Sequence, residues 1–76
     1  MFTKAQIKKA YHDGWLDDVA KDLLRYGTII KDHSFSIDSG YHAGEHREYQ
    51  IEHHGIAWSI EKHNGEVVTV GRTTDK

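Results

Sequence analysis

The segment of residues 49–70 constrains the fold most, because its apolar residues alternate with polar ones around two glycine-containing turns. Such alternation is typical of half-buried antiparallel strands. A two-residue turn at His54-Gly55 fixes the register of the first hairpin. Its opposed pairs are then Tyr49 with Ile60, Ile51 with Trp58, and His53 with Ile56. The large apolar residues share one face, and a slip of one residue would move them to the other.

The second turn, at residues 63–65, reads as a three-residue loop with its glycine in the left-handed conformation. The opposed pairs of this second hairpin are then Ile60 with Val68 and Trp58 with Val70. Together the two turns predict a three-strand meander, with strands over residues 47–53, 56–62 and 66–70.

Two helices are predicted ahead of the meander. Thr3 and Gln6 form a capping box, and the first helix should end near Asp13-Gly14. The second helix has the stronger apolar stripe, made of Leu16, Val19, Ala20 and Leu23. Gly27 stands where a helix C-terminal glycine belongs, and we expect Trp15 to pack in the core.

From Thr28 the pattern changes to a period of two, which predicts a further strand to about Asp38. Its odd-numbered face is expected to be buried, with Phe35 and Ile37 as anchors. The predicted fold is therefore α+β, with two N-terminal helices packed on one face of a four-strand antiparallel sheet that ends in the meander. Either edge of the meander could accept the first strand.

The length of 76 residues predicts a single domain over residues 1–76. The absence of cysteine excludes disulfides and thiolate metal sites. Ten basic and twelve acidic residues give a net charge of −2, which does not favour direct nucleic-acid binding. No apolar run approaches the roughly 20 residues that a membrane span needs, so no membrane association is predicted and the cytoplasm is the expected location.

Seven histidines raise the question of metal or acid–base chemistry. His42 and His46 flank Glu45 in the predicted loop of residues 39–45, and imidazoles bind zinc, copper or nickel. On a strand, however, His46 and His54 would lie about 26 Å apart and could not share an ion. We expect mostly surface histidines and no cofactor. A histidine- or metal-dependent hydrolase or nuclease that uses the 41–46 loop stays an alternative.

The sheet face turned away from the helices is the main candidate binding surface. Glu48 is expected opposite Glu61 on this face, a like-charge pair that is destabilising unless a positive group approaches. This favours a protein partner with a basic or nucleic-acid-binding surface. The predicted contact residues are Tyr41, His42, Glu45, Glu48, Glu52 and Glu61.

The chain is short, cysteine-free and mildly acidic, and it ends in a hairpin around Asn64-Gly65. In size and style it resembles the small stand-alone α+β proteins of phages and mobile elements. Many of these, anti-CRISPR proteins included, act by occupying the surface of a host protein. The resemblance implies a non-catalytic inhibitor that blocks its target sterically. A homo-oligomer built by strand addition is a further alternative, because the sheet edges are unpaired.

Overall fold

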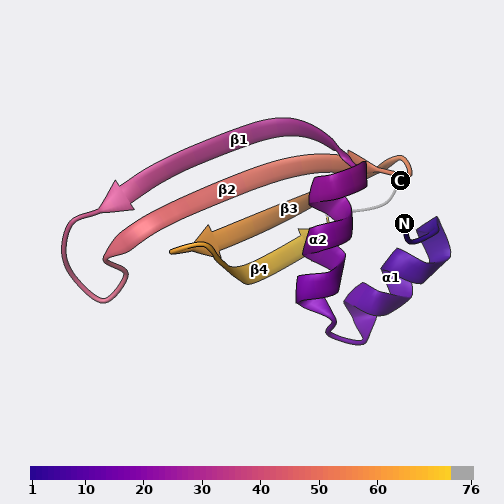
Figure 1. Cartoon of the computed structure of the whole chain (residues 1–76), viewed down its shortest axis with the longest axis horizontal. Coiled ribbons are helices and arrows are strands. Elements are labelled where there is room, and N and C mark those ends of the chain that lie inside the picture. Colours follow the sequence, from indigo (N-terminus) through magenta and orange to yellow (C-terminus); the bar gives the residue numbers. More distant parts are fainter. Residues whose placement is uncertain (73–76) are drawn as a thin grey trace.

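The computed structural model describes residues 1–72 and confirms the predicted α+β architecture. Its elements are α1 (Lys4–His12), α2 (Leu16–Tyr26), β1 (Thr28–Ile37), β2 (Gly44–His53), β3 (Ile56–His63) and β4 (Glu66–Arg72). The strands are antiparallel neighbours in the order β1-β2-β3-β4, so β1 pairs with β2 and the whole sheet is one meander. Both helices lie on the same side of the sheet (Figure 1).

The start of α1 is fixed by the predicted capping box. The Thr3 hydroxyl accepts a hydrogen bond from the Gln6 amide at 3.2 Å, and the Gln6 side chain accepts one from the Thr3 amide at 2.9 Å. These two bonds satisfy amides that a helix N-terminus would otherwise leave without a partner. Helix α2 ends at Tyr26, and Gly27 is its C-cap, at the position that the sequence predicted. Trp15, which precedes α2, is 61% exposed, so the prediction that it packs in the core is wrong.

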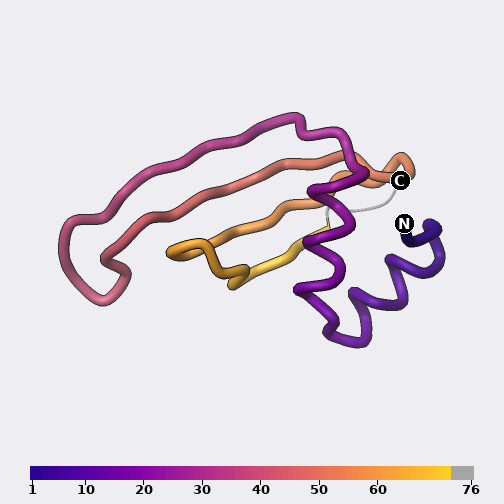
Figure 2. Tube along the Cα trace, viewed as in Figure 1, coloured from indigo at the N-terminus to yellow at the C-terminus, as the bar shows by residue number. Residues whose placement is uncertain are grey.

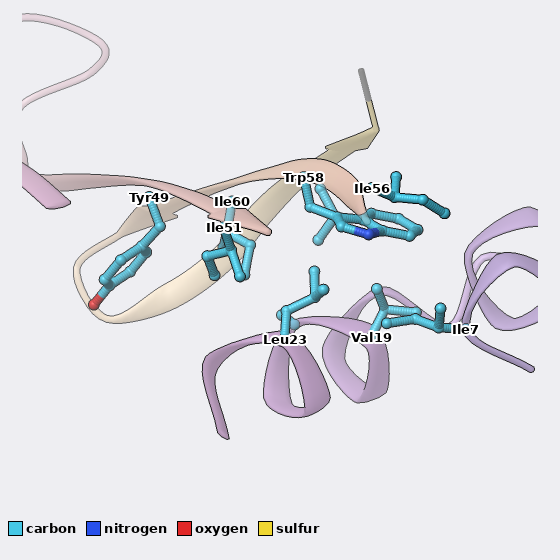
Figure 3. Packing of buried hydrophobic residues seen from close by; sticks show 10 residues of the cluster. Ile7, Val19, Leu23, Tyr49, Ile51, Ile56, Trp58 and Ile60 are labelled. Carbon is cyan, nitrogen blue, oxygen red and sulfur yellow. The ribbon is translucent and has the colours of Figure 1, made fainter. Parts of the chain in front are cut away.

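The core lies between the helices and strands β2, β3 and β4. Its buried apolar residues are Ile7, Val19, Ala20, Leu23, Tyr49, Ile51, Ile56, Trp58, Ile60 and Val70. In Figure 3, Ile51 and Trp58 point from the sheet toward Leu23 and Val19 of α2. All three predicted pairs of the β2–β3 hairpin are confirmed. This register places the apolar residues of both strands on the helix side of the sheet.

The predicted register of the β3–β4 hairpin is wrong. Asn64 and Gly65 have φ values of 52° and 84° and form a two-residue turn, so His63 pairs with Glu66. Such turns need positive φ at both central residues, which Asn-Gly supplies. The actual pairs are Ile60 with Val70 and Trp58 with Arg72. Val68 is an extra residue of β4 without an opposed residue on β3, and it is exposed.

β1 also differs from the prediction, because none of its residues is buried. Ile29 faces the helix side, but Ile30 is an extra residue at a bulge, and the register resumes at Lys31. The bulge reverses the alternation that follows it. Phe35 and Ile37 therefore lie on the face turned away from the helices and are not the core anchors that the sequence predicted.

The described part of the molecule is elongated, with extents of 40 × 24 × 22 Å. The β1–β2 hairpin continues beyond the helices, and its connecting loop, residues 38–43, lies at the end opposite to α1 (Figures 1 and 2). Within residues 1–72, no helix has the length and apolar character needed to cross a membrane.

Candidate functional site

We call the sheet surface turned away from the helices the open face. Because side chains alternate along a strand, the register assigns its members. They are Thr28, Lys31, His33, Phe35 and Ile37 of β1, His46, Glu48, Gln50 and Glu52 of β2, Ala57, Ser59, Glu61 and His63 of β3, and Glu66 and Thr69 of β4. Neither helix covers this surface in the described part of the chain (Figure 1). Residues 1–72 therefore leave this surface open to solvent or to a partner.

Three aromatic rings cross the open face side by side, and we call them the ring row. Phe35 pairs with His46, and His46 pairs with His63, so the three residues occupy one row on β1, β2 and β3. Their ring centroids are 5.1 Å and 4.6 Å apart, with interplanar angles of 9° and 10°. His33 lies beside Phe35 at 5.6 Å. The stacking holds the rings in one arrangement.

The ring row also holds the 38–43 loop. The His46 Nε2 lies 2.6 Å from the His42 carbonyl oxygen, and the His63 Nε2 lies 3.0 Å from that of Ala43. Because a carbonyl can only accept, each ring donates from Nε2. Tyr41, at the tip of this loop, is 95% exposed. The loop thus presents an aromatic side chain on a base that is hydrogen-bonded to the sheet.

The β3–β4 turn fixes the point where the loop enters β2. The Asn64 Oδ1 accepts a hydrogen bond from the Glu45 backbone amide at 2.9 Å, and the Asn64 backbone amide donates one to the Glu45 carbonyl at 2.8 Å. Gly44 has a φ of +126°, and a Cβ there would lie 2.6 Å from the Asn64 side chain. This position therefore requires glycine for two reasons, conformation and space.

Three of the predicted contact residues lie together. Glu48, Glu52 and Glu61 share the open face, and Glu48 is opposite Glu61, as predicted. Glu66 adds a fourth carboxylate to this face, and Lys31 is the single lysine assigned to it by the register. The open face of the described chain is therefore acidic.

The other predicted contact residues are spread over the distal end of the molecule. Tyr41 and His42 lie in the loop, with their rings edge to face at 5.0 Å. Glu45 pairs with Ser36 and lies on the helix side of the sheet, away from the other glutamates. The structure thus separates Glu45 from the open face.

The helix side of the distal sheet carries charges of both signs, with Arg47 and Lys62 beside Asp32 and Glu45. Arg47 is directly opposite Lys62, and the two cations lie 5.0 Å and 5.9 Å from the Tyr49 ring centroid. Asp32 accepts hydrogen bonds from the Arg47 Nε and Nη2 at 2.9 Å and 2.7 Å. These bonds hold the pKa of the Asp32 carboxyl below its usual value. A cleft of about 410 Å³ opens beside this group, with Ser34 in its wall.

The metal and hydrolase alternative rests on His42, Glu45 and His46. The His46 Nε2 is directed at the His42 backbone, where it fixes the loop. Across residues 1–72, no group of three or more His, Asp or Glu side chains is arranged to hold a metal ion. The alternative stays a prediction without a geometric feature that supports it.

A separate polar cluster is buried where α2 meets the end of β2. The His53 Nε2 lies 3.1 Å from the Asp22 Oδ2, and both side chains are nearly inaccessible. The Asp22 Oδ1 accepts a hydrogen bond from the Phe2 amide at 3.0 Å, and the His54 Nε2 donates to the Phe2 carbonyl at 2.9 Å. Loss of hydration and the neighbouring His54 lower the pKa of His53, against the opposing attraction of Asp22. This cluster ties the N-terminal segment to the core.

Sequence reasoning missed the ring row as a unit. It assigned Phe35 to the core and His63 to a turn, so neither was expected beside His46. The error at Phe35 follows from the bulge at Ile30, which changes which residues of β1 face outward, and the error at His63 follows from the two-residue turn at Asn64-Gly65. The signal available in the sequence was the Asn64-Gly65 pair, whose two-residue turn returns His63 to β3.

Comparison with known proteins adds no relative from which a role could be transferred. No family model matches the chain. No curated protein and no solved structure matches it either. Its function is therefore inferred from the geometry of its own residues.

Proposed function

We propose that the protein is a non-catalytic interaction module that binds a protein partner through the open face and the 38–43 loop. The observation that most supports this is the ring row beside Glu48 and Glu61, on a face without a covering helix in residues 1–72. Stacked rings are already ordered, so they lose little conformational entropy when a partner packs on them. Tyr41 adds an exposed tyrosine, a residue type that is enriched among those that dominate binding energy.

The charges of this face favour a partner with a basic surface. Glu48 and Glu61 repel each other in the free protein, and a lysine or arginine placed near both would relieve that repulsion. Glu52 and Glu66 extend the acidic surface along the sheet. Complementary charge accelerates association and disfavours acidic partners. Proteins that bind nucleic acids carry such basic surfaces.

The mechanism that we propose is steric. The sheet and the hydrogen-bonded loop form a surface that is present before binding, and Tyr41 projects from it as an aromatic anchor. A partner whose functional groove is occupied by this surface could not admit its own ligand. This action fits the phage- or mobile-element-type inhibitors that the chain resembles in size and composition.

The test is partner capture with charge-reversed variants. The Glu48→Lys/Glu61→Lys double variant changes the open face, and Asp17→Lys/Asp18→Lys is a matched control because it makes the same change in net charge on α2. We expect a partner that binds the wild-type protein and the α2 control, and that binds the open-face variant at least about tenfold more weakly. Equal affinity for all three proteins would refute the proposal.

His42→Ala separates this proposal from the hydrolase alternative. A histidine that acts in catalysis cannot be replaced by alanine without loss of activity, often by a factor of about 10² or more. In an interaction module the same change would only weaken binding. We expect partner binding to be reduced but measurable in isothermal titration calorimetry. A hydrolytic activity in the wild-type protein that disappears in His42→Ala would favour the enzyme.

A further inference from the structure

Within residues 1–72, no strand pairs with the outer edge of β1. β1 is the first strand in the order β1-β2-β3-β4, and all ten of its residues are exposed. Figure 1 shows it at the outer margin of the sheet, with no described element on its far side. The free backbone groups of an edge strand can pair with a strand of another molecule.

The two edges of the sheet are not equally suited to pairing. β4 has seven residues, and the extra residue Val68 interrupts it near its middle. In β1 the extra residue is Ile30, near the start, so residues 31–37 form an uninterrupted stretch. Bulges disrupt a hydrogen-bonded ladder, so β1 offers the longer regular edge. The centre of its regular stretch is Ser34.

We propose that two copies of the chain associate through antiparallel pairing of their β1 strands, about a two-fold axis at Ser34. The two four-strand sheets then form one continuous sheet of eight strands. A two-fold axis opposes residues that are equally far from it. His33 of one copy therefore faces Phe35 of the other, Asp32 faces Ser36, and Lys31 faces Ile37.

This register is favoured by charge and by length. It opposes no two residues of like charge, whereas an axis at Asp32 would place the two Asp32 carboxylates opposite each other. An axis nearer Ile37 would shorten the paired stretch. With the axis at Ser34, all seven regular residues of each strand are used.

The apolar residues of β1 gain partners in this dimer. Phe35 and Ile37 are 38% and 36% exposed in the single chain, and they would pack against His33 and the Lys31 stem of the second copy. The ring row would continue across the interface. The open face and the loop stay uncovered, so the dimer does not depend on the proposed function. Because one strand pair buries a small area, we expect a dissociation constant in the micromolar range.

Cysteine cross-linking tests the position of the axis, because the natural chain has no cysteine. In Ser34→Cys the two Cβ atoms would be about 5 Å apart, within reach of a disulfide. Ser36→Cys is the matched control on the same strand and face, with the two positions about 13 Å apart. After mild oxidation we expect a covalent dimer on a non-reducing gel from Ser34→Cys, and little from Ser36→Cys. Equal cross-linking of both variants would contradict the proposed position of the two-fold axis at Ser34.

Sedimentation velocity tests the association itself in the unmodified protein. We expect the average mass to rise from 8.8 kDa toward twice that value as the concentration increases through the micromolar range. Phe35→Lys should stay monomeric, because it places a cation beside Lys31 and His33 at the interface. Val68→Lys changes an exposed residue of the opposite edge and should leave the dimer intact. A wild-type mass of 8.8 kDa at every concentration would overturn the proposal.

Discussion

His53 is buried beside Asp22, and its environment disfavours the protonated ring. Loss of hydration and the nearby His54 lower its pKa, while the attraction of Asp22 opposes the shift without cancelling it. In the unfolded chain, His53 would titrate near its ordinary value of about 6.5. The unfolded state therefore binds more protons than the folded state at and below this pH. Stability that is present above about pH 6.5 is lost as the pH falls below it.

We therefore predict that the Tm falls when the pH is lowered through about 6.5, and that it falls less in a His53→Gln variant. Glutamine cannot take up a proton, so in this variant residue 53 no longer lets the unfolded state bind more protons than the folded state. His33→Gln is the control, because His33 is exposed on the open face. Its pH profile should follow the wild-type profile. Thermal melts followed by circular dichroism measure the Tm of all three proteins as a function of pH. Three parallel profiles would show that His53 does not contribute to the pH dependence of stability.

At the level of elements, a strand register was predicted correctly where the type of turn and the apolar–polar alternation of the strands indicated the same pairing. In the β2–β3 hairpin both pointed to one register, and every predicted pair is confirmed. In β1 and β4 a single extra residue, Ile30 or Val68, changes the face of everything that follows. Each lies beside another β-branched apolar residue, so the alternation is ambiguous there. The acidic part of the candidate surface was predictable, but the ring row was not.

The junction between loop and sheet leads to a prediction about two glycines. Gly44 and Gly40 both have positive φ, at +126° and +100°, so alanine strains the backbone at either position. Only at Gly44 would the added Cβ also collide with Asn64. We expect Gly44→Ala to lower the free energy of unfolding by about 1–3 kcal/mol more than Gly40→Ala does. Urea unfolding measures the free energy of unfolding of both variants. Equal losses would show that the Asn64 side chain moves away from the added Cβ without a loss of stability.

For the molecule as a whole, the core lies toward one end, whereas the ring row and the 38–43 loop lie toward the other. Ile51 is fully buried near α2, whereas Ile37 at the far end of β1 is 36% exposed. The two-layer arrangement was predictable because a four-strand sheet with one apolar face needs helices to cover it. The extension of the β1–β2 hairpin beyond the helices could not be predicted, because the length of a strand does not say how much of the sheet the helices cover. Substitutions at the distal end are therefore expected to have little effect on the core.

A matched pair of substitutions tests this division of the molecule. Ile51→Val and Ile37→Val remove the same methylene group, one from the core and one from the distal end. We expect Ile51→Val to lower the free energy of unfolding by about 0.5–1.5 kcal/mol, as is usual in cores. Ile37→Val should change it by less than about 0.5 kcal/mol, because surface changes rarely cost more. Both are measured by urea unfolding below the concentration at which the proposed dimer forms. If Ile37→Val cost as much as Ile51→Val, the distal hairpin would belong to the cooperative core, and its proposed role as a separable binding surface would need revision.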